Sequence, residues 1–257
     1  MRRLVHIFLC LILVAFPAKG QYREVPDSSA VEGLKTGSFR PGQLVAPAVL
    51  IGSGTLMHCF AHDTFDAAVN SSVQQWKGGA PERNFDNVLQ YAPVAMFAGL
   101  DFLGPRAEHG FVDRLVEGSI SYLTYVGAAR LMKWTIDSPR PNGGDNDSFP
   151  SGHSGLAFTG AELVRMEYGW GWGACAYLVA GTVGFMRVYN KWHWASDVIV
   201  GAGLGILSAH VGDWLMMPAE RLLGIHGQSR SASAAISIAP SVDPFSGALC
   251  TSLALRF

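Results

Sequence analysis

Apolar segments separated by short polar breaks fill most of the chain between residues 44 and 217. Segments of this length predict helices that are buried on most of their surface, against one another or in a membrane. Only 15% of the residues are charged, against roughly 25% in an average soluble domain, which favours the same interpretation. The sequence therefore predicts an all-α, six-helix bundle. Its apolar segments are 44–60, 88–103, 117–132, 154–166, 168–186 and 197–217, and an amphipathic segment at 63–76 is expected on the surface.

Two versions of this bundle fit the sequence, a membrane-associated one and a soluble one with a buried core. The segment 168–186 contains no charged residue and meets the length of about 18 apolar residues that a spanning helix requires, whereas the other segments are shorter or interrupted. The low charge and this run favour membrane association. Small residues at Gly201, Ala202, Gly203 and Gly205 also predict that the last helix approaches its neighbours closely.

The first twenty residues have the pattern of a secretory signal peptide. Arg2 and Arg3 precede the apolar run 4–16, and 17–20 would hold the cleavage site. An apolar run of about 13 residues is shorter than the ~20 needed to cross a bilayer. Export is therefore predicted. Without Arg2, Arg3 and Lys19, 16 of the 19 Lys and Arg remain against 20 Asp and Glu, a formal charge of -4.

The regions on either side of the helices differ from them in composition. Residues 21–42 are polar and predict an extended arm, and 43–218 form the helical domain. Residues 219–257 predict a linker and a short C-terminal β-hairpin packed on the bundle, because alternating apolar residues flank 240–247. The chain has no cluster of Lys and Arg that would follow a nucleic-acid backbone, so nucleic acid is not an expected partner.

Polar residues suited to binding phosphate occur in three short stretches, at or near the ends of apolar helices. The arginines can present a fork of N–H donors to a phosphoryl group, and the lysine adds a point charge. A Ser-Gly turn before a helix offers backbone N–H groups to an anion. Such a site would hold a phosphoryl group without a metal. The residues are Lys133 and Arg140, then Ser151, Gly152 and His153, then Arg187, His193 and Asp197.

The two histidines and the aspartate can be assigned chemical roles. His193 and Asp197 lie four residues apart, so on a helix they share a face, and Asp197 can accept the proton of one ring nitrogen. The other nitrogen would be free to attack phosphorus. His153 would serve as the general acid and then the base. Taken singly, each feature has a plainer explanation as a helix cap, a flanking cation or a local hydrogen bond, but their joint position favours one site.

Three motifs carry a family resemblance. Lys133 followed after six residues by Arg140-Pro141, Pro150-Ser-Gly-His153, and Arg187 followed by His193 and Asp197 resemble the signature motifs of the type 2 phosphatidic acid phosphatase and vanadium haloperoxidase superfamily. This resemblance implies a helical bundle and phosphomonoester hydrolysis without a metal or another cofactor. It also implies roles for individual residues: His193 as nucleophile, His153 as acid and base, Asp197 as orienting carboxylate, and Lys133, Arg140, Ser151, Gly152 and Arg187 as phosphate ligands.

One position departs from the family pattern. The family usually has Ser before the arginine of the third motif, and here that residue is Met186. A hydrogen bond that helps to fix Arg187 is therefore expected to be missing. The haloperoxidases of the superfamily are typically much longer chains, which argues against that activity here.

The expected function is an exported, membrane-associated phosphatase whose site faces the periplasm and whose partner is a phosphorylated lipid. The family implies phosphatidate, phosphatidylglycerol phosphate, undecaprenyl diphosphate or lipid A phosphate as candidate substrates. A soluble periplasmic acid phosphatase of broad specificity is the alternative. A non-catalytic phospholipid-binding envelope protein is a third interpretation, and the presence of His153 and His193 argues against it.

Overall fold

The computed structural model describes residues 39–224, 235–242 and 249–256. The predicted signal peptide, most of the predicted arm and residues 225–234 of the predicted linker lie outside these ranges. The prediction of an all-α domain is confirmed for 39–224. Its helices are η2 (Pro41–Leu44), α2 (Val45–Phe60), the π-helical η3 (His62–Asp66), α3 (Ala67–Lys77), α4 (Asp86–Leu89), α5 (Ala92–Gly99), η4 (Leu100–Leu103), α6 (Phe111–Thr135), α7 (Gly152–Tyr189) and α8 (Ala195–Leu223).

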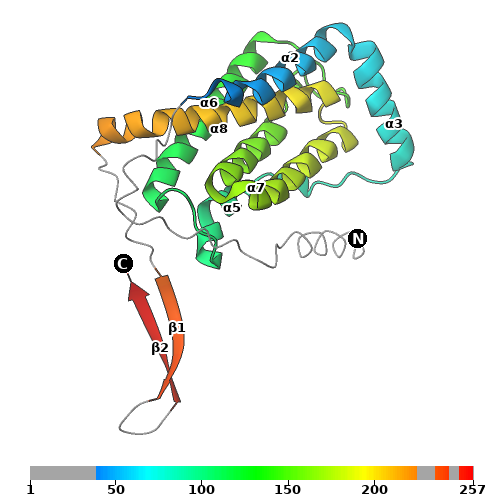
Figure 1. Cartoon of the computed structure of the whole chain (residues 1–257). Helices are drawn as coiled ribbons and strands as arrows, with labels where there is room; N and C mark the ends of the chain where they lie inside the picture. The colour runs from blue at the N-terminus through cyan, green and yellow to red at the C-terminus, as the bar shows by residue number, and fades with distance from the viewer. Residues whose placement is uncertain (1–38, 225–234, 243–248, 257) are drawn as a thin grey trace.

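The central helix of the bundle is α8, which packs against α2, α6 and α7 (Figure 1). Its glycines allow these contacts. A Cβ atom on Gly201 would lie 2.7 Å from the backbone oxygen of Ser151 at the start of α7, and one on Gly203 would lie 2.9 Å from the Leu50 side chain of α2. The close approach predicted from the small residues is therefore confirmed, on two faces of the same helix.

Two predicted helices, 154–166 and 168–186, are joined in α7. Gly169 lies between them with φ 79° and ψ -179°, a conformation that residues with a side chain rarely adopt, so the helix axis changes direction there. Alanines of both halves, including Ala157, Ala161 and Ala180, are fully buried in the core. The kink places the start and the end of α7 at the same end of the bundle (Figure 1).

The helices that are long and apolar enough to cross a membrane differ from the predicted one. Within the described residues they are Pro41–Phe60 and α8, judged by length and composition only. The run 168–186 is uncharged, but Gly, Trp and Tyr reduce its hydropathy. Also, α8 continues through Pro218 to Leu223, beyond the predicted end at residue 217.

The C-terminal strands form an antiparallel pair, β1 (Ala235–Val242) with β2 (Leu249–Arg256). The register pairs Ala235 with Arg256 and Val242 with Leu249. The predicted loop 240–247 is therefore displaced, since 240–242 belong to β1. Figure 1 shows the strands extending away from the helices, so the predicted packing on the bundle is not seen.

Candidate active site

Three helices deliver the predicted site residues to one end of the bundle. Lys133 lies in the last turn of α6, His153 in the first turn of α7, Arg187 in the last turn of α7, and Asp197 in the first turn of α8. His193 lies in the short loop between α7 and α8. The three motifs therefore meet because α6, α7 and α8 all begin or end at this place.

The indole of Trp192 is close to both arginines. The guanidinium carbon of Arg140 is 5.6 Å from the Trp192 ring centroid, and that of Arg187 is 5.3 Å from the same centroid. Both distances are within the range of cation–π attraction. Trp192 thus holds two cations of different motifs beside one another, where they can share one anionic ligand.

His193 is held in one tautomer by a backbone carbonyl. Its Nδ1–H donates to the oxygen of Ser148 at 2.7 Å, and a carbonyl can only accept. The Nε2 atom of the neutral ring therefore carries the lone pair. The side chain is 3% exposed, and burial, opposed by Asp197 and reinforced by the nearby arginines, lowers the pKa of His193 to about 4. At neutral pH this imidazole is uncharged and oriented, as a nucleophile requires.

The predicted hydrogen bond between His193 and Asp197 is not present. Asp197 Oδ2 lies 3.6 Å from His193 Nδ1, and it instead accepts from Ser148 Oγ at 2.5 Å and from the Trp194 backbone N–H at 2.9 Å. The two side chains lie close together, as the i, i+4 spacing predicts, but α8 begins only at Ala195, and His193 Nδ1 is directed to the Ser148 carbonyl. Asp197 thus orients His193 by holding Ser148, whose carbonyl accepts from the ring.

Arg187 is anchored by residues far away in the sequence. Its Nη1 donates to Asp86 Oδ2 at 2.8 Å, and Asn87 Oδ1 lies 3.4 Å from the same nitrogen. Asp86 is fully buried, so this is a buried ion pair. Met186, which replaces the usual serine, is buried and packs in the core. Met186 has no hydroxyl to hold Arg187, and the carboxylate of Asp86 in α4 fixes the Arg187 guanidinium instead.

Arg140 and Lys133 are held by the loop between α6 and α7. Arg140 Nε donates to Asp145 Oδ1 at 2.5 Å, and its Nη1 donates to the Trp192 carbonyl at 3.2 Å. Lys133 Nζ donates to the carbonyl of Asp147, and burial together with the Arg140 charge lowers the pKa of Lys133. Asp145, an exposed residue of this loop, therefore positions Arg140.

The three residues of the second motif have different environments. Ser151 is fully buried: its N–H donates to the Asp197 carbonyl at 3.0 Å, and its hydroxyl bonds to Ser154 at 2.9 Å. This geometry connects α7 to α8 and does not present Ser151 to a ligand. Gly152 is partly exposed and opens α7, where the first N–H groups of a helix have no intrahelical acceptor.

His153 is partly exposed and shares a partner with Arg187. Its Nε2 lies 3.0 Å from Asn87 Oδ1, an acceptor, so Nε2 carries a proton. Burial, followed by the charge of Arg187, lowers the pKa of His153 to about 4. The unliganded site therefore holds His153 neutral at pH 7, and the same cations that lower its pKa are available to bind an anion.

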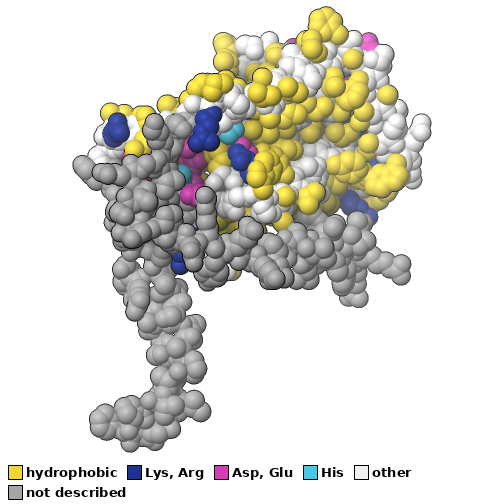
Figure 2. All heavy atoms as spheres, in the orientation of Figure 1, with side chains coloured by type: hydrophobic (Ala, Val, Ile, Leu, Met, Phe, Trp, Pro, Cys, Tyr) yellow, Lys and Arg dark blue, Asp and Glu magenta, His cyan; other side chains and the backbone are white. Residues whose placement is uncertain are grey.

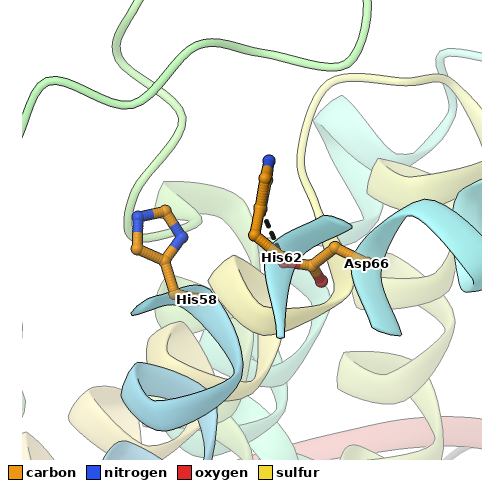
Figure 3. Close-up of side chains that lie close together, drawn as sticks. All are labelled: His58, His62 and Asp66. Atoms are coloured by element: carbon orange, nitrogen blue, oxygen red, sulfur yellow. Dashed lines mark hydrogen bonds and ion pairs between the residues drawn. The ribbon is translucent and has the colours of Figure 1, made fainter. Parts of the chain in front are cut away.

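The functional residues that the sequence did not indicate come from outside the motifs. Asp86 and Asn87 precede Arg187 by 101 and 100 positions, and Ser148 acts through its backbone oxygen. Behind Asp197 lies another group, formed by His58, His62 and Asp66 (Figure 3). Only the regular spacing of these last three, each four residues from the next, could have suggested a shared face.

A family model named PAP2 superfamily matches residues 118–219, from within α6 to within α8, and this span contains every predicted site residue. This part of the chain, which holds the candidate site, is therefore similar to the PAP2 superfamily. The chain is also 32% identical over 160 residues to a lipid A 1-phosphatase from Porphyromonas gingivalis. The alignment covers 59% of this chain and 35% of that protein, so the chain spans about a third of the relative's length.

Two solved structures resemble this chain. One is LpxE of Aquifex aeolicus, with 21% identity, a TM-score of 0.44, and coverage of 57% of this chain and 93% of the other. The second is a transmembrane PAP2 type phosphatidylglycerolphosphate phosphatase from Bacillus subtilis, with 17% identity, a TM-score of 0.42, and coverage of 74% and 98%.

Proposed function

We propose that this protein is a phosphatase that removes phosphate from a phosphorylated lipid through a phosphohistidine on His193. The observation that carries the proposal is the fixed tautomer of a buried, neutral His193 at a site lined by Arg140 and Arg187. A neutral imidazole with one nitrogen anchored and the other free is an oriented nucleophile. Cations beside it favour an anionic substrate.

The phosphoryl group would bind between the cations and the start of α7. Arg187 Nε is buried and has no hydrogen-bond partner in the described part of the chain, so a substrate oxygen can satisfy it. The N–H of Gly152 and the dipole of α7 add a further donor. Arg140 and Lys133, already held in place by the loop, supply charge without having to be ordered on binding.

The reaction then proceeds in two steps. His193 Nε2 attacks phosphorus, the bond from phosphorus to the ester oxygen breaks, and His153 gives its proton to the departing alkoxide. In the second step His153 takes a proton from water, whose oxygen attacks phosphorus, and the bond to His193 breaks. Inorganic phosphate leaves and both histidines are restored. The charge that develops on the phosphoryl oxygens is stabilised by the three cations.

His153 must carry protons on both ring nitrogens to act as the acid in the first step, although in the unliganded site its pKa is about 4. Arg187 contributes to that low value. A bound phosphate ester brings negative charge to the same cations, and an opposite charge nearby raises the pKa of an imidazole. Substrate binding is therefore the event that prepares His153 to act as an acid.

A lipid substrate is supported by the surface of the bundle. Apolar side chains cover much of the face seen in Figure 2. One face of α2 exposes large apolar residues at i, i+4, i+11 and i+15, an arrangement that suits contact with acyl chains. These residues are Val45, Val49, Leu56 and Phe60, exposed by 61%, 61%, 60% and 84%.

Among phosphorylated lipids, lipid A phosphate is the first candidate, because the curated relative is a lipid A 1-phosphatase. The predicted signal peptide places the site on the extracytoplasmic side, in contact with the membrane.

Purified full-length protein assayed with a chelator present tests the proposal. We expect release of phosphate from lipid A and from a chromogenic phosphomonoester, and its loss in His193→Ala. Rapid acid-free quenching with labelled substrate should trap label on His193. An absence of turnover, or turnover that His193→Ala leaves intact, rejects the mechanism. Turnover of the chromogenic ester alone, by protein released with carbonate, would instead identify the soluble phosphatase.

A further inference from the structure

His58, His62 and Asp66 form a cluster beside the site that the proposed reaction does not use. His58 belongs to α2, and His62 and Asp66 belong to η3, so the three side chains follow one another at intervals of about one helical turn (Figure 3). Their ligand atoms all lie within 4.8 Å of one another. Two imidazoles and a carboxylate are the donor types that Zn²⁺ takes in proteins.

The cluster touches the segment that carries Asp197. The His62 ring packs edge-on against Trp194 with centroids 4.6 Å apart, and Asp66 accepts from the Ser196 backbone N–H at 2.9 Å and from its hydroxyl at 2.6 Å. His58 Nδ1 lies 3.8 Å from Asp197 Oδ1. A ligand held by the cluster would therefore lie next to the carboxylate of the site.

Two atoms at this contact are unsatisfied. His58 Nδ1 and Asp197 Oδ1 are buried, and neither has a hydrogen-bond partner among the residues that the structure describes. Their separation of 3.8 Å is too long for a hydrogen bond. Both atoms are therefore free to respond to a cation held by the cluster: the Nδ1 lone pair of a neutral His58 can bind it, and the Asp197 carboxylate lies close enough to feel its charge.

Charge and access favour a cation at the same place. Asp66 and Asp197 are both fully buried, and buried carboxylates require compensation by hydrogen bonds or positive charge. The side chains of His58 and His62 are 17% and 32% exposed, so an ion can enter from solvent without opening the bundle. His62 would exchange its 3.1 Å hydrogen bond to Asp66 for the ion.

We propose that His58, His62 and Asp66 bind a divalent transition-metal ion of the Zn²⁺ class next to Asp197, and that the bound ion inhibits the reaction. The inhibitory half rests on the proposed function, and the binding half does not. The ion would draw charge from Asp197, which holds Ser148 and through it orients His193. The reaction proposed for His193 uses no metal, so the bound ion would act only as an inhibitor.

The test titrates chelator-treated full-length protein with Zn²⁺ by calorimetry, measures bound zinc per chain, and follows phosphate release. We expect one zinc per chain and a fall in turnover of about tenfold or more at saturation. His62→Ala should weaken zinc binding at least tenfold and remove the inhibition, while its turnover in chelator equals that of the wild type. Asp63→Ala, an exposed neighbour in η3, is the matched control and should behave as wild type.

Each other outcome decides against the proposal. No zinc binding, or equal binding by His62→Ala, overturns the site. Zinc that binds at the cluster but leaves turnover unchanged overturns the inhibition. If the wild type hydrolyses no phosphate ester, the proposed function and the inhibition fail together, and calorimetry with His62→Ala still decides whether the metal site exists.

Discussion

The two ends of the bundle are built on the same helices and differ in the charged side chains that gather there. On α6 Lys133 lies 16 residues after Glu117, and on α8 Asp213 lies 16 residues after Asp197, a separation of about 24 Å along each helix. At the site end the side chains of Lys133, Arg140 and Arg187 gather. At the other end carboxylates gather, and among them Glu117 and Glu167 are buried.

A histidine at each end shows what this difference does. Burial lowers the pKa of both rings. For His109 this effect is outweighed by the hydrogen bond and charge of Glu167, so its pKa is raised. For His193 burial outweighs the opposing effect of Asp197, the neighbouring arginines add to the effect of burial, and the pKa falls to about 4. The histidine with a direct hydrogen bond to a carboxylate is thus charged more readily, and the more deeply buried histidine, whose hydrogen bond goes to a backbone carbonyl, is kept neutral.

The largest effect is expected from exchanging the two histidines for alanine. His193→Ala should reduce turnover by at least about a thousandfold, since it removes the nucleophile. His109→Ala should leave turnover unchanged and cost about 1–3 kcal/mol of stability, because Glu167 loses its partner. Phosphate release and thermal unfolding measure the two quantities. Comparable turnover losses in both variants would mean that the site is not confined to one end.

A second comparison uses arginines that each bind a carboxylate. Arg187→Lys should lower kcat/KM by about a hundredfold, because one ammonium cannot bind Asp86 and a phosphoryl oxygen as a fork does. Arg165→Lys is the matched control, since Arg165 lies away from the site and donates two hydrogen bonds to Glu162, of 2.7 and 2.6 Å. Its kcat/KM should stay near the wild-type value. If Arg187→Lys keeps full activity, the guanidinium serves only the fold.

A smaller effect is expected where the site is held together. Ser148→Ala removes the hydroxyl that Asp197 accepts but keeps the carbonyl that orients His193. We expect kcat to fall by about tenfold with KM unchanged, as for groups that orient another residue. Ser208→Ala, which removes a hydroxyl bonded within α8, should change neither constant. A rise in KM at constant kcat would instead place the Ser148 hydroxyl against the substrate.

The smallest effect on turnover is expected from a change at the acidic end, where only stability should respond. Burial, followed by the charge of Glu167, raises the pKa of Glu117 well above its ordinary value. Protonated Glu117 favours the folded state. This contribution to stability is fully present below the pKa of Glu117 in the unfolded chain, about 4.5, and is lost as the pH rises through its pKa in the folded protein.

Glu117→Gln keeps the shape and removes this pH dependence. We expect the variant to gain stability relative to the wild type as the pH rises from about 5 to the folded pKa of Glu117, because over that range only the wild type must retain a proton that its unfolded state has released. Melting temperatures at pH 5, 7 and 9 measure this change. Glu82→Gln, on the exposed loop before α4, is the control. Parallel curves for wild type and Glu117→Gln would show that Glu117 is already ionised.

The motif residues could be predicted from the sequence because each lies at or near the end of a helix that the apolar pattern reveals. Their partners could not. Asp86 reaches Arg187 only after α4 packs on α7, and His58 reaches Asp197 only after α2 packs on α8. Helical spacing brought Asp197 to within 3.6 Å of His193 but could not show that the Nδ1–H of His193 donates to the Ser148 carbonyl instead. Local spacing cannot specify such tertiary contacts.

The backbone bond from Ser151 to Asp197 ties the start of α7 to the start of α8. What keeps those two turns in register lies deeper, where a Cβ on Gly205 would come within 2.5 Å of the Gly155 carbonyl. Gly205 is eight residues, or about 12 Å, beyond Asp197 along α8. A random screen for inactive variants should therefore recover Gly205→Ala, which adds a single methyl group at a position that no substrate reaches.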